Sequence, residues 1–238
     1  MAKLDEVSLE RLEDMLEAGS QIEECYRLLN KSARNIVGQV IEHHGTFYEY
    51  DHYPPGDVYD PEIHAQYYYH SHRPEKGEHG HFHTFLRAKG MPKNVSPSPY
   101  SGDWERPMGK DALAHIIAIS MDGPGFPMTL FTTNRWVTAE TFYPADDVIA
   151  MMDSFEIDHV YPCLAVNQWI GAMVRLFRPD IEDLLQQRDR SIQDWQDAHP
   201  DGDVYEDRDL EVTSALKISV PKQITAVRKA LQRRKKAA

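Results

Sequence analysis

The N-terminal forty residues carry apolar side chains at the spacing of amphipathic helices. Between Leu9 and Ile41 these side chains recur every three or four positions, so they share one helical face. Ser8 can cap the first helix, and the polar stretch 30–32 predicts a break, because an unbroken helix would reach about 50 Å. We therefore expect two helices. The apolar positions are Leu12, Met15, Leu16, Ile22, Tyr26, Leu29, Ile36, Val37 and Val40.

The pattern further along the chain predicts two β-hairpins. Residues 65–69 and 84–87 are rich in aromatic and β-branched types, and the linker 73–78 between them carries a proline and a glycine. A second hairpin is predicted from the apolar runs 113–122 and 127–137, which a Gly-Pro-Gly-Phe turn separates. The first of these runs is apolar without alternation, which indicates a central strand covered on both sides.

The rest of the chain reads as loops and helices around this sheet. Residues 45–63 are predicted to be an ordered loop that leads into the first hairpin. The long segment 90–112 is expected to be either a functional loop or partly disordered, and it is a candidate lid over the first hairpin. From Pro144 onward, helices are expected over 146–155, 167–177 and 181–198, with a last helix that begins at Ser219 and Pro221.

The predicted fold class is α+β. An antiparallel sheet of about four strands, made of two hairpins, is flanked by N-terminal and C-terminal helices. We expect one domain over 1–238, with helices in 1–44, the sheet in 45–137 and helices again in 138–238.

Five of the twelve histidines fall within residues 70–83. Side chains alternate between the two faces of a strand, so a six-residue loop would place His72 opposite His79, His70 opposite His81 and Tyr68 opposite His83. All five rings would then lie on one side, within reach of a shared ion. We expect three of them to be ligands and the others to orient these ligands or touch substrate. The predicted metal ligands are His70, His72, His79, His81 and His83.

Other interpretations of these histidines stay open. Closely packed imidazoles without an ion would form a pH-responsive cluster, and a solvated histidine face is a further alternative. Histidines that stand alone in the sequence are expected to be structural or at the surface. These are His43, His64, His115, His159 and His199.

Candidate catalytic and substrate-binding residues surround the histidine block. Tyr68 shares its predicted face, and Glu78, directly before His79, is one of the acidic partners available. Arg87 follows the same alternation and could hold an anionic group of a substrate. A surface position for Arg87 is the simpler alternative. Further aromatic and acidic residues predict a pocket for a small organic substrate. These are Asp103, Trp104, Trp136 and Tyr143.

Composition limits the partners and the compartment. The net charge of −12 argues against general nucleic-acid binding, because a polyanion requires a basic surface. There is no long apolar run and no secretory signal pattern, so we expect a cytoplasmic protein that does not enter the membrane. Cys25 and Cys163 are then expected to be free thiols. The amphipathic helices leave oligomerisation possible.

The sequence also resembles a known group of proteins. The blocks YYHSHRPEKGEHGHFHTFL, HIIAISMD, LFTTNRWVTAETFYPADDVIAM and VNQW with LFRP are similar to an uncharacterised bacterial domain-of-unknown-function family, from about Tyr26 to the C-terminus. The resemblance implies no reaction, cofactor or catalytic residue. The HxH step also resembles the cupin metal motif, but the carboxylates Glu75 and Glu78 have the wrong spacing. Zinc-protease, zinc-ribbon and phosphate-loop motifs are absent from the sequence.

These patterns predict a metal-dependent enzyme that acts on a small organic substrate. Two histidines with one carboxylate would suit non-haem iron, and imidazoles alone also suit copper and zinc, so iron or copper is favoured and zinc is possible. Redox or oxygenase chemistry is accordingly placed before hydrolysis. The alternative is a non-catalytic metal or haem binder that buffers, delivers or senses. A third hypothesis is a helical interaction protein in which the histidines are incidental.

Overall fold

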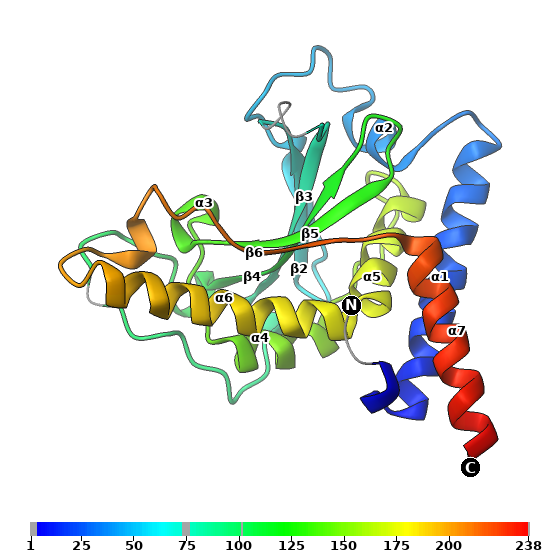
Figure 1. Ribbon diagram of the computed structural model, residues 1–238. Coiled ribbons are helices and arrows are strands. Elements are labelled where there is room, and N and C mark those ends of the chain that lie inside the picture. The colour runs from blue at the N-terminus through cyan, green and yellow to red at the C-terminus, as the bar shows by residue number, and fades with distance from the viewer. Residues whose placement is uncertain (1–3, 73–76, 101, 238) are drawn as a thin grey trace.

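The central element of the molecule is one antiparallel sheet (Figure 1). The computed structural model describes residues 4–72, 77–100 and 102–237, and within these residues the sheet has six strands that follow one another in sequence order. The α+β class and both predicted hairpins are confirmed, whereas the expected number of about four strands is too low. The tip of the first hairpin, 73–76, lies outside the described residues. The strands are β1 (Tyr53–Tyr59), β2 (Ala65–His70), β3 (Gly80–Arg87), β4 (Leu113–Met121), β5 (Pro127–Thr133) and β6 (Val212–Lys217).

The two strands that the sequence pattern did not predict lie at the edges of the sheet. β1 was expected to be loop because it contains Pro54, Pro55 and Gly56, but an edge strand tolerates prolines, since one side of it needs no ladder donors. β6 lies in the segment that was expected to be helical only. It pairs with β5 about eighty residues earlier, so a tertiary contact decides its conformation.

The helices form much as the apolar spacing predicts. Ser8 caps the first helix by accepting a hydrogen bond from the Arg11 backbone N–H (3.2 Å), and the predicted break near residues 30–32 is present. Pro144 precedes a helix, and the break at Arg178 separates two others. The helices are α1 (Leu9–Asn30), α2 (Ile36–Ile41), α3 (Arg135–Thr138), α4 (Ala145–Met151), α5 (Leu164–Leu176), α6 (Arg178–Ala198) and α7 (Val220–Ala237).

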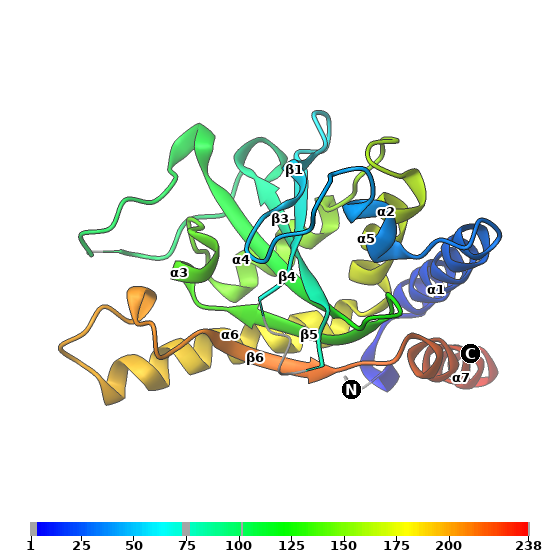
Figure 2. The same cartoon turned by 90° about the horizontal axis from the view of Figure 1, so that it is seen from above.

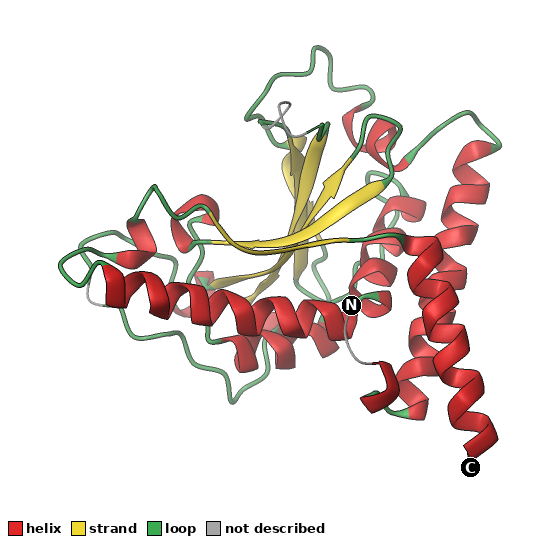
Figure 3. Ribbon diagram, viewed as in Figure 1, coloured by secondary structure: helices red, strands yellow, loops and turns green. Residues whose placement is uncertain are grey.

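The long helices gather on one side of the sheet. Figure 3 shows α4 and α6 below the strands and α5 beside them, and α1 packs between α5 and α7. The apolar face of β2 and β3 meets this layer. Phe82 has no exposed surface, and its ring lies 4.9 Å from that of Tyr69 and 5.8 Å from that of Trp169 on α5. None of the helices in the described residues is long and apolar enough to cross a membrane.

The segment between α2 and β1 crosses the strands on the side away from α4 and α6 (Figure 2). It is held there because the Tyr50 backbone N–H donates to the Ser71 carbonyl (3.0 Å). The other predicted loop, 90–112, is held by the C-terminal half. The Tyr100 hydroxyl donates to Asp203 (3.2 Å), and the Ser98 N–H donates to the Phe142 carbonyl (3.1 Å).

Candidate metal centre

The pairing of β2 with β3 brings three histidines together. His70 lies opposite His81, and Tyr68 lies opposite His83, as strand alternation predicts. The ring centroids are 4.4 Å apart for His70 and His81, 4.9 Å for His81 and His83, and 5.2 Å for His70 and His83. One possible ligand atom from each residue lies within 4.8 Å of the others. His81 and His83 are fully buried and His70 is 9 % exposed, so the cluster is shielded from solvent.

Two of these rings are oriented by buried partners behind them. His81 Nδ1 lies 2.5 Å from Glu78 Oε1, and His83 Nδ1 lies 3.0 Å from His115 Nε2. Burial, and next the charge of Arg188, lower the pKa of His115 to about 3, so its imidazole is neutral and can accept the His83 Nδ1 proton. With both Nδ1 atoms engaged, His81 and His83 present Nε2 as the ligand atom.

The third ring completes a geometry that fits an ion. His70 Nε2 and His81 Nε2 lie 2.7 Å apart. Because His81 Nδ1 donates to Glu78, its Nε2 accepts, and His70 Nε2 carries the shared proton. Two nitrogens at about 2.0–2.1 Å from one tetrahedral ion would lie about 3.3 Å apart. A small outward shift of these rings therefore accommodates a metal ion.

His72 lies at the rim of the cluster. Its half-buried ring is 5.0 Å from each of the rings of His70 and His81, and Tyr50 stacks on it at 5.4 Å. This ring is on the predicted side of the sheet and next to two of the three clustered histidines.

The expectation that all five rings share one side is wrong for His79. Its Nδ1 lies 2.7 Å from the Tyr69 hydroxyl, and its ring is 5.7 Å from Phe47, which packs against the helix-side core. His79 precedes Gly80, the first residue of β3, so it does not follow the alternation of the strand. The Tyr69 hydroxyl holds its ring on the helix side instead.

Tyr68 forms one wall of the centre. It is 6 % exposed, and its ring lies 5.2 Å from His83 and 5.6 Å from Phe85. Burial raises the pKa of the Tyr68 phenol well above its usual value, so the hydroxyl keeps its proton at neutral pH. His52 lies flat on the same ring, with 3.6 Å between the centroids and 9° between the planes.

A chain of hydrogen bonds links the predicted residue Arg87 to His52. Arg87 Nε donates to Gln66 Oε1 (2.6 Å), Gln66 Nε2 donates to Asp57 Oδ2 (2.6 Å), and Asp57 Oδ1 lies 3.0 Å from His52 Nδ1. Arg87 therefore connects to the centre through three intermediate side chains. The sequence pattern did not single out His52 or Asp57, because their segment was expected to be loop.

Two further residues lie behind the centre, and one of them, His115, was expected to be structural or at the surface. His115 lies on β4, and its ring is 5.0 Å from that of His83. Glu140 is 1 % exposed, and its Oε2 accepts the His115 backbone N–H (2.7 Å). Burial raises the pKa of Glu140 to about 7 against the opposing charge of Arg188. A lone histidine inside the apolar run of β4 was a signal that could have identified His115.

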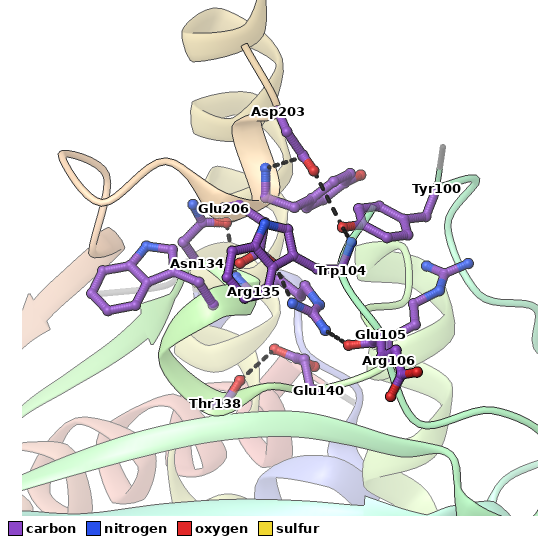
Figure 4. A network of polar contacts seen from close by, with 12 residues as sticks. Tyr100, Trp104, Glu105, Arg106, Asn134, Arg135, Thr138, Glu140, Asp203 and Glu206 are labelled. Carbon is purple, nitrogen blue, oxygen red and sulfur yellow. Dashed lines mark hydrogen bonds and ion pairs between the residues drawn. The ribbon is translucent and has the colours of Figure 1, made fainter. Parts of the chain in front are cut away.

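The four residues predicted to line a substrate pocket differ in their exposure and surroundings. Asp103 is exposed, Trp104 is 59 % exposed, and Tyr143 is buried in the main core. Trp136 donates its indole N–H to the Leu210 carbonyl (3.0 Å). Figure 4 shows Trp104 within the network around Tyr100 and Arg135. None of their described contacts reaches the three histidines, and a role for them in substrate binding stays a prediction.

Comparison with known proteins identifies a family without a function. A family model described as "Domain of unknown function (DUF6969)" matches residues 16–218, which is most of the chain. Searches of curated proteins and of solved structures gave no match. The resemblance to a domain-of-unknown-function family is thereby confirmed.

Proposed function

Because this chain belongs to the DUF6969 family, for which no function is described, we propose from the site alone that the protein is a metal-dependent enzyme acting on a small organic substrate. The observation that carries the proposal is the group of three buried imidazoles, His70, His81 and His83, whose ligand atoms lie within 4.8 Å of one another. Such closely placed, desolvated nitrogens favour a shared cation.

The number of ligands supports a catalytic role. Catalytic zinc sites use three protein ligands and keep the fourth position for water or substrate, whereas structural sites use four. An ion held in this way activates water or polarises a substrate oxygen. The orientation of His81 by Glu78 and of His83 by His115 supplies the outer partners that catalytic metal sites employ.

The position of Glu78 changes the expected order of metals. An iron site of the two-histidine type needs a carboxylate among its ligands, but the Glu78 carboxylate faces Nδ1 of His81. The remaining set is all imidazole, which suits zinc and copper. We therefore place zinc and copper before iron, and zinc-type hydrolysis or hydration beside copper-type redox chemistry.

Residues on the side of the centre away from the helices could bind a substrate and exchange protons with it. The Tyr68 hydroxyl is a protonated donor next to His70 and His83, and Asp57 orients His52 over it. A hollow of about 450 Å³ beside β1 is lined by His52, Tyr48 and Tyr53, among others. We propose that the substrate approaches through this side, with His52 exchanging a proton with it.

Reconstitution with metal tests the proposal. Protein stripped by a chelator is loaded with Zn²⁺, Cu²⁺ or Fe²⁺ in turn, and bound metal is measured by elemental analysis. Wild type should retain about one equivalent of its preferred metal, and His81→Ala less than about a tenth. His79→Ala is the matched control, because His79 lies on the helix side, and it should match wild type. Less than a tenth of an equivalent of every metal in wild type would contradict the proposal.

A non-catalytic metal binder is the second candidate, and the complete burial of His81 and His83 favours it. The two functions differ in whether the ion has an open position. Cobalt-substituted protein distinguishes them, because azide changes the visible spectrum of an ion that it can reach. A spectral change supports the enzyme, and an unchanged spectrum supports the binder.

A further inference from the structure

Glu140 is a buried carboxyl group, and the hydrogen bonds that it accepts within the described residues come from neutral donors. It is 1 % exposed. Its Oε2 accepts the His115 backbone N–H (2.7 Å), and its Oε1 accepts the Thr138 hydroxyl (3.2 Å), as Figure 4 shows for Thr138. Both donors are neutral, so the carboxylate form of Glu140 is costly in this position.

The nearby cations are engaged with other groups. Arg188 of α6 donates to the Tyr143 carbonyl (2.6 Å) and to Asp189 (2.7 Å). Arg135 of α3 pairs with Glu206 and donates to the Glu105 carbonyl (2.7 Å). Their charges act on Glu140 from a distance and only partly offset its burial, which raises its pKa to about 7. The other titratable groups that face it are His115 of β4, Tyr68 of β2 and Tyr143.

Glu140 is connected to the metal centre through a single residue. It binds the backbone of His115, and the ring of His115 binds His83 at 3.0 Å. The charge of Glu140 also acts on Tyr68, which stands against His70 and His83. A change of charge at Glu140 therefore reaches the centre through a buried region of low dielectric.

The centre itself has too little negative charge for a divalent ion. Three neutral imidazoles add none, and the Glu78 carboxylate beside His81 adds one. A divalent ion would leave an uncompensated positive charge in a buried site. Resting on the metal binding proposed above, we propose that Glu140 is the second counter-charge of the centre: it is a neutral carboxylic acid in the metal-free protein and releases its proton when the ion binds.

The proton balance is simple. One divalent ion enters, the O–H bond of Glu140 breaks, and the proton leaves to solvent, so the bound state gains one positive charge in total. Coordination by His70 moves a proton between its two ring nitrogens and releases none. Glu140 acts through His115 and His83 and is thus a positioning residue. Its role can be measured as the number of protons released when the ion binds.

Calorimetry of Zn²⁺ binding to the full chain measures this count. Binding heats at pH 7 in buffers of different ionisation enthalpy give the number of protons released. Wild type should release about half a proton more per ion than Glu140→Gln, because Glu140 is about half protonated at that pH. The affinity of wild type should exceed that of Glu140→Gln by about tenfold at pH 8 and by less at pH 6.

Two further variants make the result specific. Glu140→Asp keeps a titratable group and should restore proton release. Asp180→Asn removes another carboxyl that is 1 % exposed, on α6 beside Gln223, and should release as many protons as wild type. Equal proton counts in wild type and Glu140→Gln, with zinc bound to both, would overturn the inference and leave the proposed metal site standing. No zinc bound to wild type would instead refute the metal site.

Infrared spectroscopy gives a test on wild type alone, which holds even if Glu140→Gln does not fold. A buried protonated carboxyl has a carbonyl band separate from those of carboxylates. This band should disappear when Zn²⁺ is added to the metal-free protein. Its persistence after zinc has bound would overturn the inference.

Discussion

The two faces of β2 and β3 have opposite chemical characters. On one face Tyr67, Tyr69 and Phe82 pack against the helices in the main core. On the other face the same strands place Tyr68, His81 and His83 in a buried polar cluster. Adjacent residues of a strand thus point to opposite faces, one into the apolar core and the next into the polar cluster.

The two faces contribute differently to the stability of the fold. The helix face buries apolar surface, which favours folding. The histidine face buries His115 and Glu140, whose pKa values are displaced to about 3 and about 7 against their charged forms. Strongly displaced pKa values of this kind gather at functional sites, so the polar face is where we expect the chemistry.

The largest effect should come from the helix face. Phe82→Ala removes a fully buried ring and should lower the free energy of unfolding by about 3–5 kcal/mol, measured by urea titration. Metal bound per folded chain should stay as in wild type. Loss of the metal from folded Phe82→Ala protein would show that the two faces do not act separately.

The pH dependence of stability should reveal the opposite face. In the folded metal-free protein Glu140 keeps its proton up to about pH 7, whereas a carboxyl in the unfolded chain loses its proton near pH 4.5. The stability that protonated Glu140 contributes is therefore lost as pH rises from 4.5 to about 7. Neutral His115 has the reverse effect, because its contribution is lost as pH falls from 6.5 through about 3.

Glu140→Gln removes only the first of these effects. The free energy of unfolding of the metal-free variant should increasingly exceed that of wild type as pH rises, by about 3 kcal/mol at pH 8. Thermal or urea unfolding across pH measures this difference. Near pH 4 the two proteins should be similar. A difference that is constant with pH would contradict the displaced pKa.

A smaller effect is expected at Glu78. Glu78→Gln removes the charge that orients His81 but keeps a hydrogen-bond acceptor, so affinity for Zn²⁺ should fall about 10–100-fold, measured by competition with a chelator. Glu62→Gln, at an exposed position, is the control and should bind like wild type. Unchanged affinity in Glu78→Gln would show that the carboxylate does not support the ligand.

The smallest effect should come from a residue outside both faces. Trp104 is 59 % exposed, so Trp104→Ala should change the free energy of unfolding by less than about 0.5 kcal/mol and leave metal content unchanged. A contact between Trp104 and substrate would appear as a higher KM at the same metal content. A large loss of stability would contradict the exposed position.

Much of the sheet and the core of the site follows from local patterns. The period of two and the length of the hairpin loop place His70 opposite His81 and Tyr68 opposite His83, and both pairs are present. His79 departs because it lies outside the strand, where alternation no longer applies. Beyond the strand ends the side of a ring depends on its local partners, which are Tyr50 for His72 and the Tyr69 hydroxyl for His79.

Other features depend on contacts between distant segments. β6 becomes a strand by pairing with β5, and Glu140 enters the site through the backbone of His115. His52 reaches Tyr68 because the Tyr50 backbone ties its segment to Ser71. Neither spacing nor composition encodes such contacts, so the approach of His52 to Tyr68 and of Glu140 to His115 was not predictable from the sequence.

Anomalous scattering from a crystal of the zinc-loaded protein tests the central claim most directly. Data collected on both sides of the zinc absorption edge locate the ion without reference to the protein coordinates. We predict one peak at about 2.0–2.1 Å from a nitrogen of each of His70, His81 and His83. A zinc peak elsewhere, or these three rings turned away from any common point, would contradict the account.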